Sequence, residues 1–430
     1  MNPLRVLITN NTLDARAGTE LYVYDLAVAL LERGHQPVAY SNILGQVAGD
    51  LREACVPVID QLDSLSIAPD IIHGHHHLEA MTALMHFPRT PAVLFCHSWR
   101  HWEEMPARFP RIRRYLAMNQ PTYNRLTCEH GVPPEQVEWM PNFVDLKRFQ
   151  LRLPLPQRPV RAAVFSNHAR EDGYLRIIRA ACDRSGLALD VLGLGVGNPV
   201  PRPWEVLGKY DLVFASGRCA LESLASGTAV IICNTFGLGP MVTAAKVDEL
   251  RTFNFGSMST IGRPFDVDQV LIEIAHYSAD DAADASRRVR AVAGLDSTVD
   301  RLATLYTDVI TEQQHARVTA DDESRAVAAY LRQISDRVKA SGLVRHSLDV
   351  ARAETAGLNH LLDVSRAETA GLSFLLDVAT HENVQLGAAY DTASAELAAA
   401  HQTLTMRIRQ RLIRVNILMR LHRLVRRSRP

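Results

Sequence analysis

Six histidines crowd two neighbouring segments in the first third of the chain, which concentrates groups capable of acid–base or metal chemistry. They are His73, His75, His76, His77, His97 and His101. His73 and His77 have the i, i+4 spacing of two metal ligands on a helix. The segment has the pattern of a strand end, however, where that spacing does not apply, so we expect no metal. We expect His73 and His97 to form hydrogen bonds along a ligand cleft, and the alternative for each is a structural role.

Two predicted helix starts could bring backbone amides close to an anion. Gly18 follows the first apolar run, and free N–H groups at a helix start attract phosphate. Glu222 is a lone carboxylate on a short predicted helix between the apolar runs DLVFAS and TAVIICN. Neither place has the Gly-x-Gly-x-x-Gly spacing of a dinucleotide fingerprint, and the glycines at 193–197 also miss it. Each signal is modest on its own.

The familiar patterns of several other enzyme classes are missing from the sequence. It has no nucleophile elbow, no paired-carboxylate spacing, no Walker loop and no Cys-x-x-Cys pair. A hydrolase, a kinase or a thiol redox enzyme therefore lacks support.

Short apolar runs alternate with helical patterns on both sides of a proline-rich stretch at 151–159. The first run, LRVLIT, precedes a helical pattern for which Thr19 can serve as N-cap and Gly34 as C-cap. Strands that alternate with helices indicate parallel sheets covered on both faces. The sequence therefore predicts two doubly wound, Rossmann-like α/β domains in tandem, at residues 1–150 and 151–311.

Composition indicates a globular protein with an uneven distribution of charge. Hydrophobic residues make up 47% of the 430 residues and charged residues 22%, with a formal net charge of zero. Residues 401–430 contain nine arginines and no acidic residue, which leaves a net charge of −9 on residues 1–400. The six cysteines have no paired spacing, and five lie in or beside apolar segments, so we expect buried, reduced thiols and a cytoplasmic location.

The pattern changes after about residue 312, where strand signals give way to a fourteen-residue repeat. The copies are LDVARAETAGL, LDVSRAETAGL and the divergent LDVATHENVQL. Leucines alternate with alanine, serine or threonine at spacings of three and four, as in a coiled-coil seam. We expect a helical coiled coil at 312–400 that supports self-association, and the alternative is a solvated single helix.

The last segment, 401–430, interleaves arginine with isoleucine, leucine, valine and methionine. A basic amphipathic helix of this composition can lie on an anionic membrane from the cytoplasmic side. The alternatives are packing on the acidic body or unspecific binding of nucleic acid.

Five segments together resemble glycosyltransferase family 4, which has the GT-B fold. They are AGTELYVYDLAVALLERGH, PDIIHGH, VLFCHS, EHGVPPEQVEWMPNFVDLKRF and DLVFASGRCALESLASGTAVIICN. The resemblance covers roughly residues 4–310. It implies transfer of a sugar, of the hexosyl type, from a nucleotide-sugar donor to a glycan or lipid-linked acceptor in polysaccharide biosynthesis. It further implies retention of anomeric configuration and no metal or other cofactor.

The resemblance also assigns roles to individual positions. It implies a ribose-binding carboxylate at Glu222, which could accept hydrogen bonds from two vicinal hydroxyls. It implies a donor-binding glycine at Gly18, an acceptor-side catalytic histidine at His97, and a cleft-lining residue at Asn142 between the domains. The remaining donor-binding positions that it implies are Ser216, Gly217, Arg218 and the loop of Gly237, Leu238 and Gly239.

Two features of the family are absent from this sequence. The first glutamate of the Glu-x7-Glu motif would fall at Phe214, and the basic pair that binds the donor pyrophosphate would fall near Asn167 and Asp172. Arg170, Arg218 and Lys209 are candidate replacements. The main alternative is therefore a non-catalytic GT-B scaffold tethered to a membrane-bound polysaccharide assembly, and a sugar-nucleotide epimerase is a further one.

Overall fold

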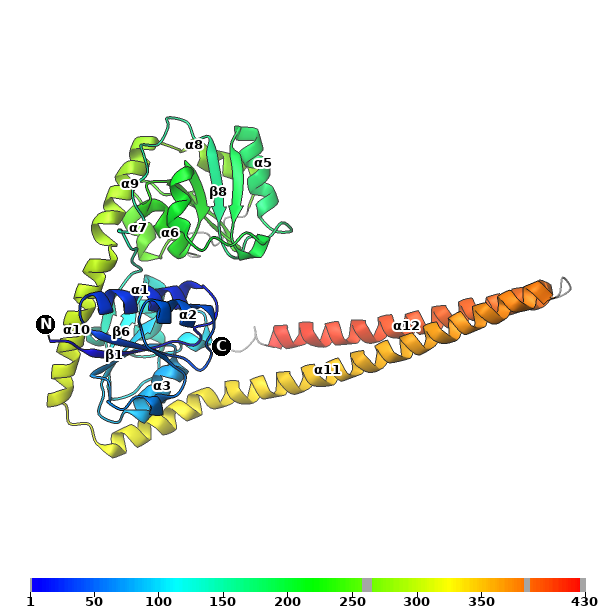
Figure 1. Cartoon of the computed structure of the whole chain (residues 1–430), viewed down its shortest axis with the longest axis horizontal. Coiled ribbons are helices and arrows are strands. Elements are labelled where there is room, and N and C mark those ends of the chain that lie inside the picture. The colour runs from blue at the N-terminus through cyan, green and yellow to red at the C-terminus, as the bar shows by residue number, and fades with distance from the viewer. Residues whose placement is uncertain (1, 257–264, 383–386, 426–430) are drawn as a thin grey trace. The chain divides into compact units, whose positions relative to one another are not determined.

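The computed structural model describes residues 2–256, 265–382 and 387–425, with side chains described except at 374–393 and 414–425. The chain divides into two compact units, Met1–Val327 and Ala328–Pro430. The first unit contains both sheets, and the described residues of the second are helical (Figure 1).

Seven parallel strands form the first sheet, in the order β3-β2-β1-β4-β5-β6-β7. Its strands are β1 (Arg5–Thr9), β2 (Gln36–Tyr40), β3 (Val58–Ile59), β4 (Ile71–His75), β5 (Ala92–Cys96), β6 (Ile112–Ala117) and β7 (Val137–Trp139). The helices in this part of the chain are α1 (Gly18–Glu32), α2 (Gln46–Glu53), α3 (His77–His86) and α4 (Gln120–Asn124). The strand order reverses between β1 and β4, and ligands of open α/β sheets bind beside such a point, at the carboxyl ends of the strands.

Helix α1 forms because an apolar stripe faces the sheet and a glycine ends it. Tyr22, Leu26 and Leu30 recur at i, i+4 and are each at most 1% exposed. The N-cap is Ala17 and not the predicted Thr19, which lies inside the helix. Gly34 follows the end of the helix with a φ of +81°, a left-handed conformation in which glycine terminates helices.

Five strands form the second sheet, in the order β12-β11-β10-β8-β9, and only β12 runs antiparallel to its neighbour. They are β8 (Arg161–Phe165), β9 (Ala188–Leu192), β10 (Leu212–Ala215), β11 (Ala229–Asn234) and β12 (Gly237–Met241). The helices here are α5 (Leu175–Ser185), α6 (Gly217–Ala225), α7 (Val247–Thr252), α8 (Val267–Ala275) and α9 (Ala279–Val292). Along β10, Val213 and Ala215 pack on one face of the sheet and Leu212 and Phe214 on the other, as the strand period requires.

The chain crosses twice between the two α/β halves, and the two crossings are paired. The amide of Val144 donates to Ala293 (2.8 Å), and the amide of Leu295 donates to Val144 (2.9 Å). Helix α10 (Leu295–His315) then returns to the first half, where Val299, Leu302 and Tyr306 complete its hydrophobic core. The predicted fold class, two α/β sheets followed by helices, is confirmed.

The C-terminal helices are α11 (Ala320–Glu382) and α12 (Gly387–Val425). Between Val344 and Ser373 the half-buried side chains of α11 all fall on the predicted seam or its heptad continuation. They are Val344, Ala351, Leu358, Leu362, Ser365 and Thr369. The structure shows a long helix with this pattern, and a coiled coil stays a prediction. The third repeat, from Leu376, lies outside the described side chains.

Among the described residues no helix is both long and apolar enough to cross a membrane. All six cysteines are free thiols. Cys96, Cys182 and Cys233 are buried as predicted, whereas Cys55 and Cys128 are exposed, so the prediction of five buried thiols is wrong.

Candidate functional site

The start of α6 lies at the carboxyl end of β10, where the order of the second sheet reverses. Gly217 has a φ of +60°, which favours glycine, and its amide donates to the carbonyl of Phe255 (3.0 Å). That amide is therefore engaged, although the sequence suggested that it would be free. The side chain of Ser216 makes no capping hydrogen bond, and residues 216–219 are half-buried. The amides that follow, of Arg218 and Cys219, form an uncapped helix start that suits an anion.

Glu222 lies one turn into α6, 5% exposed, and is paired with Arg218 on the same helix. Nε of Arg218 donates to the Glu222 carboxylate (2.7 Å), and Nη2 of Arg218 donates to Asp25 of α1. Burial raises the pKa of Glu222, and Arg218 only partly offsets this effect. Burial opposes the charge on Arg218, but the carboxylates of Asp25 and Glu222 outweigh it and raise the pKa of the guanidinium.

Asp25 extends this pair into a chain of charges between the two halves. Its other carboxylate oxygen accepts a hydrogen bond from Arg148 (3.0 Å), which also pairs with Asp145 (3.0 Å). The guanidinium of Arg148 lies 5.5 Å from the ring centres of both Tyr24 and Trp204. Asp25 is only 3% exposed, so the helix that begins at Gly18 is joined to α6 by desolvated charges.

The histidines of the first half meet at the carboxyl ends of β4 and β5. Nε2 of His97 lies 2.6 Å from Nδ1 of His75, and the His97 amide donates to Glu104 (2.8 Å). Burial lowers the pKa of His97 to about 4 and that of His75 well below its usual value. Both rings are therefore uncharged at neutral pH, and His97 could act as a neutral donor or acceptor toward a hydroxyl group.

His76 connects this cluster to the loop after β1. Its Nδ1 accepts a hydrogen bond from the amide of Asn11 (3.1 Å), and its Nε2 lies 3.4 Å from Glu104. The residue has a φ of +61°, which is uncommon outside glycine and stores strain. Glu104 and His76 thus hold together three loops at the carboxyl edge of the first sheet.

His73 does not line a cleft, and the prediction that it would is wrong. The side chain is 0% exposed, and its Nδ1 lies 2.6 Å from the hydroxyl of Tyr306 on α10. Burial lowers its pKa to about 3. Sequence reasoning missed this because the partner, Tyr306, lies 233 residues further along the chain.

The other predicted positions fall in different surroundings. Asn142 donates to the side chain of Asn254 (3.1 Å), which joins the interdomain segment to the end of α7. Gly18 is exposed, with open space where a Cβ would stand. The predicted loop of Gly237, Leu238 and Gly239 is instead part of β12, paired with β11. Leu238 is buried there, and a Cβ on Gly239 would lie 2.8 Å from Ile232.

The structure narrows the choice of a replacement for the missing basic pair. Asn167 accepts a hydrogen bond from the amide of Leu194 (3.2 Å) and so organises the neighbouring loop. Lys209 precedes β10 and lies at the amino edge of the sheet, away from Ser216. Arg170 is exposed in the loop after β8, at the carboxyl edge. Arg218 is the candidate at the start of α6 itself.

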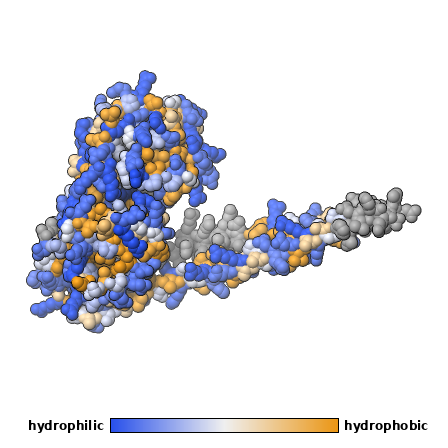
Figure 2. Space-filling model, in the orientation of Figure 1, coloured by the Kyte–Doolittle hydropathy of each residue, from blue (hydrophilic) through white to orange (hydrophobic). Residues whose placement is uncertain are grey.

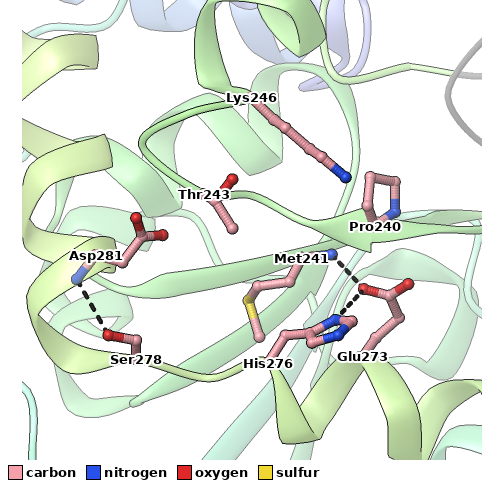
Figure 3. Close-up of a pocket in the computed structure, with 8 residues that line it drawn as sticks. All are labelled: Pro240, Met241, Thr243, Lys246, Glu273, His276, Ser278 and Asp281. Atoms are coloured by element: carbon pink, nitrogen blue, oxygen red, sulfur yellow. Dashed lines mark hydrogen bonds and ion pairs between the residues drawn. The ribbon is translucent and has the colours of Figure 1, made fainter.

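A cavity of about 370 Å³ lies elsewhere in the second half, between β12, α8 and α9 (Figure 3). Lys246 and Asp281 are among its lining residues, and Glu273 accepts a hydrogen bond from the amide of Met241 there (2.7 Å). Since β12 runs antiparallel, Met241 lies toward the amino edge of the sheet, so this cavity is separate from the start of α6. Among the described residues, no group of three or more His, Cys, Asp or Glu side chains could hold a metal ion.

Sequence reasoning did not find Asp25 or Glu104. Each had a weak signal, because Asp25 interrupts a largely apolar helix face and Glu104 follows the histidine-rich segment. The partner of Asp25 lies far along the chain, and Glu104 meets His76 and His97 only through the conformation of the loops. No local pattern could therefore have assigned either residue a role.

Comparisons with known proteins agree with this architecture. Residues 16–148 match the model of Glycosyltransferase Family 4, so the resemblance seen in the sequence is confirmed over this segment. A search of curated proteins finds no match to the chain.

Solved structures show the same fold at low sequence identity. A glycosyltransferase from Rickettsia africae ESF-5 is 13% identical with a TM-score of 0.53, covering 72% of this chain and 99% of its own. HepE from Anabaena, in complex with UDP and glucose, is 14% identical with a TM-score of 0.51, covering 71% and 99%. HepE in complex with UDP-glucose is 13% identical with a TM-score of 0.51, covering 71% and 100%. These likenesses show that the chain has a GT-B-like fold.

Proposed function

We propose that the protein is a glycosyltransferase that transfers a sugar from a nucleotide-sugar donor to a glycan or lipid-linked acceptor. The observation that carries this proposal is the arrangement of Glu222 one turn behind the uncapped start of α6. This helix lies at the switch point of the second sheet and is joined to α1 through Arg218 and Asp25. The family match lies in the other half, so the donor site rests on this geometry.

The donor would bind with its nucleotide against α6. The carboxylate of Glu222 would accept hydrogen bonds from the ribose hydroxyls, and the amides of Arg218 and Cys219 would face the diphosphate. Within the described residues Nη1 of Arg218 makes no hydrogen bond, so two of its donors remain available for a phosphate oxygen. UDP is the first nucleotide to test, since HepE was crystallised with UDP and UDP-glucose.

The acceptor would approach from the carboxyl edge of the first sheet. His97 is uncharged and 8% exposed there, and we assign it to the acceptor hydroxyl. Charge that develops on the leaving diphosphate would be stabilised by the amides of α6 and by Arg218, which requires no metal. Retention of anomeric configuration is part of this proposal.

A non-catalytic scaffold is the second candidate, and one observation favours it. No cation stands at Asn167 or Asp172, and Arg218 is shared between two carboxylates. A diphosphate would therefore meet less positive charge here than the family's basic pair would supply.

Calorimetric titration with nucleoside diphosphates tests the donor site. We expect wild-type protein to bind UDP and the variant Glu222→Ala to bind it at least about tenfold more weakly, because a charged hydrogen-bond acceptor is lost. Glu249→Ala, an exposed carboxylate on α7, is the matched control and should bind like wild type. If the wild type binds no nucleoside diphosphate, the donor site proposal is wrong.

A second measurement separates the enzyme from the scaffold. Release of UDP from UDP-glucose, followed with purified protein, should occur with wild type and fall with Glu222→Ala. Binding of UDP without any release, across a panel of nucleotide sugars and acceptors, would favour the scaffold.

A further inference from the structure

The segment 401–430 has a charge that the proposed transfer reaction does not use. It contains nine arginines and no acidic residue, and it follows a body of net charge −9. Three of these arginines, Arg407, Arg409 and Arg411, lie in the described part of α12, and all three are exposed. A surface of this kind attracts an anionic partner and is screened by salt.

Exposed apolar side chains lie among these arginines. Met406, Leu412 and Ile413 are 62%, 54% and 50% exposed. Leu404 and Ile408, four residues apart and so neighbours on the helix, are half-buried instead. Met406 follows Leu404 by two residues, which places it on the other side of the helix.

Leu412 follows Ile408 by four residues and so continues this row, although its side chain is exposed. Met406 and Ile413 are seven residues apart and share another side of the helix, where both are exposed. Apolar and polar side chains also alternate along the described parts of the long helices in Figure 2. Exposed apolar groups flanked by arginine fit a surface that offers both negative charge and hydrocarbon.

We infer that the basic stretch 401–413 of α12 binds the surface of an anionic lipid bilayer. The arginines contact lipid phosphates, and Met406 and Ile413 enter the boundary between headgroups and acyl chains. In this proposal the stretch lies on the membrane surface. A protein held in this way would be concentrated beside lipid-linked acceptors.

Nucleic acid is the other anionic partner, and two features disfavour it. Residues 401–430 contain no phenylalanine, tyrosine or tryptophan on which bases could stack. A phosphate backbone would also leave Met406 and Ile413 in water. The proposal does not depend on catalysis, so it survives if the transferase proposal fails.

Sedimentation of the full-length protein with lipid vesicles tests the inference. We expect little pelleting with phosphatidylcholine alone and strong pelleting when phosphatidylglycerol is included, weakened by added salt. Replacing Arg407, Arg409 and Arg411 by glutamine should weaken partitioning by roughly fivefold for each arginine. Replacing Met406 and Ile413 by serine should weaken it further even though no charge changes, because buried apolar area is lost.

A matched control replaces the exposed α11 residues Arg332, Arg337 and Arg345 by glutamine, with the same change in charge. This control should pellet like wild type, and circular dichroism should show that all variants keep their helix content. Equal loss in control and α12 variants would overturn the inference, because net charge alone would then explain binding. It is also overturned if the serine variant pellets unchanged and duplex DNA competes fully with vesicles, since the segment would then bind any polyanion.

Discussion

The carboxyl edges of the two sheets bury polar side chains in different ways. At the edge of the first sheet, His75 and His97 are uncharged rings joined by one hydrogen bond. At the edge of the second, Arg218 keeps its charge between Asp25 and Glu222. Neutral rings suit hydroxyl groups, and a helix start with a fixed cation suits phosphate. The difference supports the proposal that the first edge receives the acceptor and the second edge the nucleotide donor.

The largest expected effect on stability comes from placing a second carboxylate in β10 of the second sheet. Phe214 stands where the family motif has its first glutamate, but the side chain is 0% exposed within β10. We expect Phe214→Glu to lower the free energy of unfolding by about 4 kcal/mol or more, because an unpaired charge would be buried. Urea denaturation followed by circular dichroism measures this loss.

Phe214→Leu is the control, with an expected loss of about 1 kcal/mol from a change of shape alone. If Phe214→Glu is as stable as this control, the site has room and solvent for a carboxylate. Packing around position 214 would then not explain why the first glutamate of the motif is absent.

The next effect comes from removing the carboxylate that joins the two halves. Asp25→Ala leaves Arg218 and Arg148 without their shared partner, so we expect a loss of about 3 kcal/mol of stability. Asp300→Ala removes an exposed pair with Arg33 and should cost less than about 1 kcal/mol. Equal midpoints of urea denaturation for the two variants would contradict a desolvated link between the halves.

The pH dependence of stability tests whether the buried histidines of the first sheet are uncharged. Burial lowers the pKa of His97 to about 4 and that of His73 to about 3, below the value of about 6.5 in an unfolded chain. Between the folded and unfolded pKa values the unfolded chain binds more protons than the folded protein. The contribution of these histidines to the free energy of unfolding is therefore fully present above pH ~6.5 and is lost as the pH falls toward 4. Each such histidine contributes on the order of 1 kcal/mol per pH unit to this slope.

Denaturation midpoints measured across this pH range should show the decline. His73→Gln should flatten the slope, whereas His315→Gln, at an exposed position on α10, should leave it unchanged. A wild-type stability that does not change over this range would show that the buried rings can take up protons.

The sequence predicted the alternation of strands and helices because hydrophobic period is a local property. It also predicted the helix that begins after Ser216 and carries Glu222. It failed at Gly237–Met241, where two glycines and a proline disfavour a strand but pairing with β11 imposes one. The pairing of Asp25 with Arg218 spans 193 residues, so no single-sequence pattern could reveal it.

The paired crossings at Val144 and Leu295 have a consequence for synthesis of the chain. The second α/β half is inserted between the strands of the first half and α10, the helix that completes its core. A nascent chain therefore exposes part of the first core while the whole second half is made, because Tyr306 and its neighbours emerge only after that half. The second half can fold as soon as its own residues leave the ribosome, although it is translated later. We therefore expect the half that is translated first to finish folding last.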